Sequence, residues 1–422
     1  MILAALMILG ILATPLDAMQ RRFTFAELGK DTGTLSVGEP TIAGARVTVN
    51  GVDAARPGTP FTFDWGDGSA SRGFFPGQHV YADTSRNYTV TVTAHYGDRT
   101  DARSVQVSFV KPTFTYRRDP GIPKRVRVAV RPVPLATTMP GYRPPTDLLG
   151  FDDSGLAVPR DALEYALDVG HAIQMDLCNG DVDTSGGLDQ VVLNQPSFGG
   201  AFSLWFTRPV AMGANPGYLS NIAGLSSLYH EMGHNITLNS PACYRFGGKT
   251  DGPMNTIVSE ALAQIMQHAT AWLILNHPDR YGLGPALAEG LERSATRAFE
   301  GMARSHRDYV AQGCPFATRQ QPGSKQDRTF GTFMTVAFVF VEGADRAGDL
   351  RGATKRLMRL LQTFSAEDHR RYQIPENDAF RATFMVAAIS HGLQRDMRPR
   401  FRELRFPIDD AVYAEMMARV RQ

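Results

Sequence analysis

The sequence predicts a multidomain chain in which a small all-β, immunoglobulin-like sandwich precedes an α+β domain with a helical C-terminal half. Three observations support this fold class. The 422 residues exceed what one compact core usually holds. Short alternations of β-branched and aromatic residues, separated by glycine and proline turns, fill residues 35–111. Residues 124–210 contain segments with the pattern of strands, and after about residue 218 apolar residues recur at helical spacing.

Composition excludes some function classes without naming one. The apolar fraction of 43% is that of a folded globular protein rather than a disordered chain. The formal charge of +2 comes from 44 basic and 42 acidic residues that are mixed along the chain. Such a balance gives no reason to expect nucleic acid or an anionic membrane as the partner. We therefore expect no nucleic-acid partner.

Residues 1–20 are expected to be a signal peptide or an N-terminal anchor. The apolar run from Ile2 to Thr14 ends at Pro15 and is shorter than the about 20 residues that span a bilayer. Leu16-Asp17-Ala18 is an acceptable cleavage site, but no positive charge precedes the run, so a buried first helix is the alternative. We expect a secreted or cell-surface protein that contacts membrane only through this segment if it stays uncleaved.

Residues 35–111 carry the pattern of a β-sandwich. Its alternating segments are Arg46–Val49, Phe61–Phe63, Tyr88–Thr93 and Val105–Val107. Trp65-Gly66-Asp67-Gly68 predicts a tight turn, because glycine admits positive φ and aspartate can accept bonds from neighbouring amides.

Together with His79-Val80-Tyr81, these segments give the region a recognisable likeness. It resembles the polycystic-kidney-disease (PKD) domain, an immunoglobulin-like sandwich found as an accessory module on exported hydrolases and surface proteins. The resemblance implies a spacer or adhesion role and no chemistry. His79 and Tyr81 are therefore expected to be core or turn residues and not ligands.

A linker is expected over residues 112–123, and a second domain over 124–422, strand-rich in 124–210 and helical in 218–422. The alternation from Arg125 to Val130 predicts the first strand of its sheet. Pro159 suits the first turn of a helix whose apolar positions recur on one stripe. Val191–Leu193 and Ala201–Phe206 predict further strands.

The pentapeptide His230-Glu231-Met232-Gly233-His234 predicts a metal site. On a helix, residues four apart are offset by only about 40°, so both imidazoles can bind one zinc ion. Glu231 lies beside them, where it can reach a zinc-bound water without binding the metal. The alternative is a solvated helix with two satisfied histidines.

A catalytic zinc needs a third protein ligand and an open position. Glu260 is the preferred candidate, since a carboxylate inside an apolar helical face is costly unless it is paired or bound to metal. It follows His234 by 26 positions (260 minus 234), enough for a loop and a helix turned back against the first. Asp251 is the alternative ligand, from a loop.

These motifs resemble the gluzincin superfamily of zinc metallopeptidases, in its enhancin-like or aminopeptidase-like branch. The likeness rests on His230-Glu231-x-x-His234, on Glu260 within Ser-Glu-Ala-Leu-Ala, and less sharply on the segment Asp396–Ile408. Two positions depart from the family patterns: Thr237 replaces a glutamine common in enhancin-like members, and Gln264 replaces the aspartate of thermolysin-like ones.

The resemblance implies one catalytic Zn2+ held by His230, His234 and Glu260, with Glu231 as the general base. It also implies a donor for the reaction's oxyanion, usually a tyrosine or histidine from a later helix. The available candidates are Tyr309, His306, Tyr372 and His391.

A second metal is a weaker expectation. The spacing of Asp181, Asp183, Ser185 and Asp189 follows the first half of an EF-hand loop and suggests a structural Ca2+. Val192 occupies the position where such a loop needs a bidentate glutamate, so a plain acidic turn is the alternative.

The expected function is a secreted zinc-dependent peptidase that hydrolyses polypeptide or glycoprotein substrates. Ser203 stands where aminopeptidase-like gluzincins carry the glutamate that binds the substrate's α-amine, which favours an endopeptidase over an aminopeptidase. The other alternative is a cell-surface adhesion protein with an inactive peptidase-like domain. The intact Glu231 counts against it, because a binding protein has no need of a general base.

Overall fold

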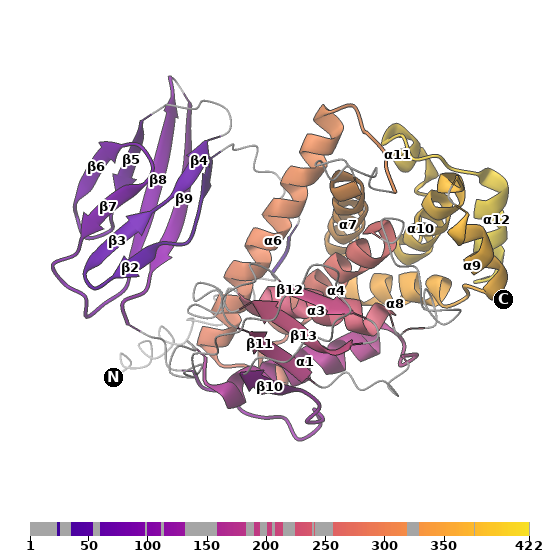
Figure 1. The fold of residues 1–422 in the computed structure, drawn as a ribbon, viewed down its shortest axis with the longest axis horizontal. Coiled ribbons are helices and arrows are strands. Elements are labelled where there is room, and N and C mark those ends of the chain that lie inside the picture. The colour runs from indigo at the N-terminus through magenta and orange to yellow at the C-terminus, as the bar shows by residue number, and fades with distance from the viewer. Residues whose placement is uncertain are drawn as a thin grey trace, which may run out of the picture.

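A computed structural model describes residues 23–25, 35–53, 60–97, 99–110, 114–130, 158–182, 190–194, 201–204, 207–213, 224–238, 240, 256–318, 329–374 and 376–421. Figure 1 shows a β-sandwich beside a larger, mainly helical part, with a small mixed sheet next to α1 and α3 at one end of it. The long helix α6 (Pro285–Ala311) lies on the side of the helical part nearest the sandwich.

The sandwich is built from strands β1 to β9. Its two larger sheets have the orders β2-β3-β7 and β6-β5-β8-β9, and β1 pairs with β4. All pairings within it are antiparallel. The bounds are β1 Leu35–Val37, β2 Thr41–Ala43, β3 Arg46–Val49, β4 Gly51–Asp53, β5 Phe61–Asp64, β6 Ala70–Gly73, β7 Gly77–Val80, β8 Tyr88–Tyr96 and β9 Arg99–Val107.

The sandwich has its own aromatic core, and its turn chemistry follows the sequence prediction. Tyr81 is buried and donates a hydrogen bond to the Trp65 carbonyl (2.7 Å). His79 stacks on Trp65 and pairs with Asp67 at 2.7 Å. His79 and Tyr81 therefore have structural contacts in the turn and the core, as expected. Gly66 has φ of +77°, and a Cβ there would meet the Thr89 carbonyl oxygen at 2.4 Å. The turn therefore requires glycine.

The part of the chain after the sandwich contains one further described sheet, with the strand order β10-β11-β13-β12. Strands β10 (Arg127–Val130), β11 (Gln190–Asn194) and β13 (Thr207–Gly213) run parallel, whereas β12 (Ala201–Leu204) pairs antiparallel with β13. Among the described strands, β12 is thus an edge strand that pairs on one side with β13. It lies next to helix α3 (Gly224–Leu238), the helix that carries the predicted histidines.

The remaining chain is largely helical. Pro278, Pro285 and Pro399 each stand in a first helical turn, where a missing N–H costs nothing. Ser365 and Asp368 form a capping box at α9. The other bounds are α1 Arg160–Leu177, α4 Thr256–Asn276, α5 Pro278–Tyr281, α7 Thr329–Arg346, α8 Leu350–Leu361, α9 Ala366–Gln373, α10 Asp378–Leu393, α11 Arg398–Glu403 and α12 Asp410–Ala418.

Helix α4 is the centre of this helical part. It packs against α1, α3, α6, α7 and α8, and it is drawn in the middle of the helices in Figure 1. From Val258 to Ile274 nearly every side chain is buried, including Ala261, Ile265 and Ala269. A helix that is apolar all round is typical of such an interior position.

The core of the helical part includes a residue from before the sandwich. Phe25 is 0% exposed, stacks on Phe299 of α6 and meets His268 of α4 edge-on. Asn276 donates to the carbonyl of Phe23 (3.3 Å). The chain therefore contributes to this core on both sides of the sandwich.

Within the described residues, no helix combines the length and apolarity needed to cross a bilayer. Residues 1–20, where a signal peptide or anchor is expected, lie outside the described residues.

We predict that Phe25→Ala destabilises the helical part by about 3–5 kcal/mol, because it leaves a cavity between α4 and α6. Thermal or denaturant unfolding measures the loss. Phe74→Ala is the matched control, since Phe74 is 58% exposed and its removal leaves no cavity. Equal stability of the two variants would contradict the placement of Phe25.

Candidate metal centre

Helix α3 presents both histidines of the pentapeptide. Leu225, Leu228, Met232 and Ile236 form its apolar stripe and are at most 3% exposed. This burial fixes the rotation of the helix, so that His230 and His234 point to the same side, one turn apart.

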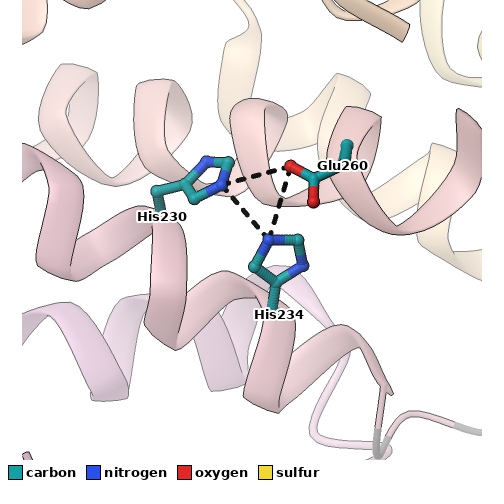
Figure 2. Close-up of side chains that lie close together, drawn as sticks. All are labelled: His230, His234 and Glu260. Carbon is teal, nitrogen blue, oxygen red and sulfur yellow. Dashed lines mark hydrogen bonds and ion pairs between the residues drawn. The ribbon is translucent and has the colours of Figure 1, made fainter. Parts of the chain in front are cut away.

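Helix α4 brings Glu260 to these histidines, as Figure 2 shows. The three ligand atoms lie within 4.8 Å of one another. The Nε2 atoms of His230 and His234 are 3.2 Å apart, and Glu260 Oε2 lies 3.5 Å from the first and 3.6 Å from the second. The structure thus brings together the three residues that the sequence proposes as ligands.

These distances fit a tetrahedral zinc site. With metal–ligand bonds of about 2.0–2.1 Å, two ligand atoms of a tetrahedron are separated by about 3.3 Å. The three observed separations, 3.2, 3.5 and 3.6 Å, surround that value. Two imidazoles and one carboxylate are also a donor set that suits zinc and leaves a fourth position open.

Close packing of α3 on α4 depends on Gly233, which stands between the two histidines. A Cβ at this position would lie 3.0 Å from Met266 Cβ and 3.2 Å from Ala263 Cα, both on α4. Neither atom belongs to the flexible end of a side chain, so a larger residue would push the helices apart.

A neighbouring hydroxyl orients one of the ligands. His234 Nδ1 lies 3.0 Å from Ser259 Oγ, which leaves Nε2 facing His230 and Glu260. Such contacts fix the tautomer and the ring orientation of a metal-binding histidine. Ser259 precedes Glu260 directly, so the turn of α4 that supplies one ligand also orients another.

Helix α1 holds α3 in place from the other side. Tyr229 donates to the Ala166 carbonyl (2.8 Å), and Gln174 donates to the Tyr229 carbonyl (2.8 Å). A Cβ on Gly170 would lie 2.2 Å from the Tyr229 ring, so only glycine permits this packing. The buried tyrosine thereby anchors the residue just before His230.

The two glutamates have opposite electrostatic environments. Burial opposes ionisation of Glu260, but its hydrogen bonds with His230 and His234 outweigh burial and hold its pKa below the usual range. Burial raises the pKa of Glu231 to about 7. Glu231 is 7% exposed, and its Oε2 is buried without a hydrogen-bond partner among the described residues. Glu260 is therefore bonded to the two histidines, whereas Glu231 has a carboxylate oxygen that can still accept a hydrogen bond or a proton.

A cavity of about 540 Å³ opens on His230 and Glu231. Its other walls come from α4, α6 and α7. They include Gln264, Gln267, Arg297, Arg304, Phe330 and Met334. No sequence motif singles out the two arginines, because nothing in their local pattern relates them to a histidine about 70 positions earlier.

The four predicted oxyanion donors do not line this cavity. Tyr309 is buried and donates to the Leu404 carbonyl (2.9 Å). The His306 ring stacks on Phe338 and lies 3.2 Å from Thr335 Oγ1. Tyr372 packs on Phe364, and His391 lies on α10. The choice among these four residues stays a prediction.

Several predicted residues lie outside the described part of the chain. They are the alternative ligand Asp251 and three of the calcium candidates, Asp183, Ser185 and Asp189. Asp181 is described and exposed. Ser203 lies in β12, where the pairing with β13 shifts register between Phe202 and Leu204.

No family model, curated protein or solved structure matches this chain.

We predict that Gly233→Ala lowers zinc affinity by about 10–100-fold, as changes to the support of metal ligands do. The added methyl group separates α3 from α4 and moves Glu260 away from the histidines. Competition with a chromophoric chelator measures the affinity. Gly301→Ala on α6 is the control, because nothing lies within 4 Å of its added Cβ. Unchanged zinc binding in Gly233→Ala would contradict this dependence.

Proposed function

We propose that the chain is a secreted zinc-dependent peptidase that cuts within polypeptide or glycoprotein chains. The observation that carries the proposal is the cluster of His230, His234 and Glu260 next to Glu231, at the wall of a cavity. The cluster offers ligands with the spacing of a tetrahedral site, and Glu231 offers an unbonded carboxylate oxygen beside it.

The proposed reaction is hydrolysis of a peptide bond. A zinc ion held by the two imidazoles and Glu260 would supply Lewis-acid polarisation of a water and of the substrate carbonyl. Glu231 accepts a proton from the water while the water oxygen attacks the carbonyl carbon. It then gives that proton to the leaving nitrogen, the C–N bond breaks, and a carboxylate and an amine are released.

The edge strand β12 supports cleavage within chains. Its free side offers backbone groups to which an extended polypeptide can add as a further strand. β12 packs beside α3, so a polypeptide added there would run next to the histidines. Ser203 on this strand cannot pair with a substrate's ammonium group as a glutamate would, which argues against selection of free N-termini.

An adhesion protein with an inactive peptidase-like domain is the competing proposal, and the PKD-like resemblance of the sandwich favours it in part. Glu231 argues against it. A buried carboxylate with an unbonded oxygen is costly, and a purely binding role does not require it.

Glu231→Gln tests the peptidase proposal. We expect the variant to keep one zinc ion per chain and to lose hydrolysis by at least about 100-fold, because its ligands survive and its base does not. Glu260→Ala should instead lose zinc, since it removes a ligand. Metal analysis and digestion of a peptide library measure both. Full activity in Glu231→Gln, or zinc retained in Glu260→Ala, would contradict the assignment.

Matched peptides with free and acetylated N-termini test the mode of cleavage. We expect both forms to be cut at the same internal bond at similar rates, because nothing on β12 selects an ammonium group. Mass spectrometry of the products identifies the bond. Cleavage of the free peptides alone, one residue at a time, would show an aminopeptidase.

A further inference from the structure

Two arginines of α6 face the cavity that opens on the metal cluster. Arg297 and Arg304 are seven positions apart (304 minus 297), which puts them on one helix face about 10 Å apart along the axis. Gly301 lies between them and also lines the cavity, so the helix backbone approaches there without a side chain. The pair therefore forms one cationic wall opposite His230 and Glu231.

The described residues that line this cavity include two arginines and one carboxylate, so the lining carries more basic than acidic groups. Among the described residues that line the cavity, Glu231 is the one carboxylate. Glu300 attracts Arg297 electrostatically but does not line the cavity. Within the described part of the chain, Arg304 has no ion-pair partner and is exposed. Bound zinc would add further positive charge to the same space.

Arg297 already binds a carboxylate from another part of the chain. Its guanidinium forms an ion pair with Glu39, which lies between β1 and β2 of the sandwich. Both side chains remain about one third exposed, 38% for Arg297 and 33% for Glu39, so the pair is open to exchange with solvent groups. Burial also lowers the pKa of Arg297, which indicates a partly desolvated cation.

We propose that this cavity selects a carboxylate-bearing group of the substrate next to the scissile bond, and that Arg297 and Arg304 bind it. The proposal deepens the proposed peptidase function and rests on it. A guanidinium recognises a carboxylate through two parallel hydrogen bonds, which gives direction as well as charge. Glu39 then acts as an internal competitor that occupies Arg297 until a substrate carboxylate displaces it.

The same arginines could instead stabilise the oxyanion of the reaction, and the two roles differ in what they predict. An oxyanion donor acts on every peptide bond, whatever the flanking residue. A carboxylate-binding residue acts only on substrates that carry the carboxylate. The comparison of acidic and amide substrates therefore separates the roles.

The first test uses the full chain loaded with zinc and peptides that differ only by Asp or Glu against Asn or Gln beside the cut bond. We expect the acidic peptides to have a kcat/KM roughly tenfold higher, through KM. Arg297→Gln and Arg304→Gln should each reduce that preference, and Arg297→Lys should restore part of it. Arg293→Gln is the matched control, because Arg293 lies on the same helix and pairs with Glu289 away from the cavity.

Glu39→Gln gives a second, opposite signature. Removing the competitor should lower KM for acidic peptides a few-fold and leave amide peptides unchanged. In an Arg297→Gln background the same change should have no effect, because the shared partner is gone. A purely structural role for the ion pair would alter both classes of peptide alike.

Binding to the inactive Glu231→Gln variant separates this proposal from the peptidase function. Fluorescence anisotropy with labelled acidic and amide peptides should show the same roughly tenfold preference without any turnover. If the wild-type chain cuts no peptide while this preference holds, the peptidase function fails and the carboxylate site stands. If peptides are cut but acidic and amide forms bind and react equally, no side-chain carboxylate is selected, and the site then stands only if a carboxylated sugar is preferred. Equal loss on both classes in Arg297→Gln and Arg304→Gln also refutes it.

The carboxylate could belong to an amino-acid side chain or to an acidic sugar on a glycosylated residue. A third arm therefore compares one glycopeptide with and without its terminal carboxylated sugar, at a fixed neutral peptide sequence. A preference for the acidic glycan with none for Asp over Asn assigns the group to the sugar, and the reverse assigns it to the side chain. No preference in either comparison overturns the proposal.

Discussion

For His230, His234 and Glu260 to hold one metal ion, their ligand atoms must lie about 3.3 Å apart, so helices α3 and α4 would have to keep their separation to within a few tenths of an ångström. Gly233 makes that separation possible, because α4 atoms occupy the space that any side chain would need. Ser259 and Glu260 then reach the two histidines from adjacent positions. The arrangement of His230, His234 and Glu260 therefore depends on the contact between α3 and α4.

The surrounding structure stabilises that contact from both sides. Helix α4 is buried among five other helices, so it has little freedom to shift. Helix α3 is held by Tyr229 and Gln174, which join its backbone and side chains to α1. Deep burial also explains why Glu231 can keep an unbonded oxygen: the rigid packing, rather than the carboxylate itself, determines its place.

Local patterns predicted the residues whose roles depend on local geometry. The four-residue spacing of His230 and His234 defines a shared helix face, and the cost of a carboxylate on an apolar face singled out Glu260. Residue type alone suggests the oxyanion donors, and Tyr309 shows what residue type leaves out: its hydroxyl donates to a carbonyl 95 positions away. Gly233, Phe25 and the arginines of α6 depend on contacts between distant segments, which no local period encodes.

Arg297 connects the sandwich to the candidate site, although the PKD-like resemblance implies no chemistry for that module. An ion pair between partly exposed side chains contributes roughly 0–1 kcal/mol, because solvent screens it and two long side chains lose freedom. A pair of that strength cannot hold the sandwich against the helical part by itself. The ion pair is, however, weak enough for a substrate carboxylate to replace Glu39. Arg297 then keeps a carboxylate partner, and Glu39 becomes solvated. Phe25 supplies the firmer link, because its burial in the helical core anchors the chain just before the sandwich begins. The charge of Glu39 can therefore serve recognition without being needed for the fold.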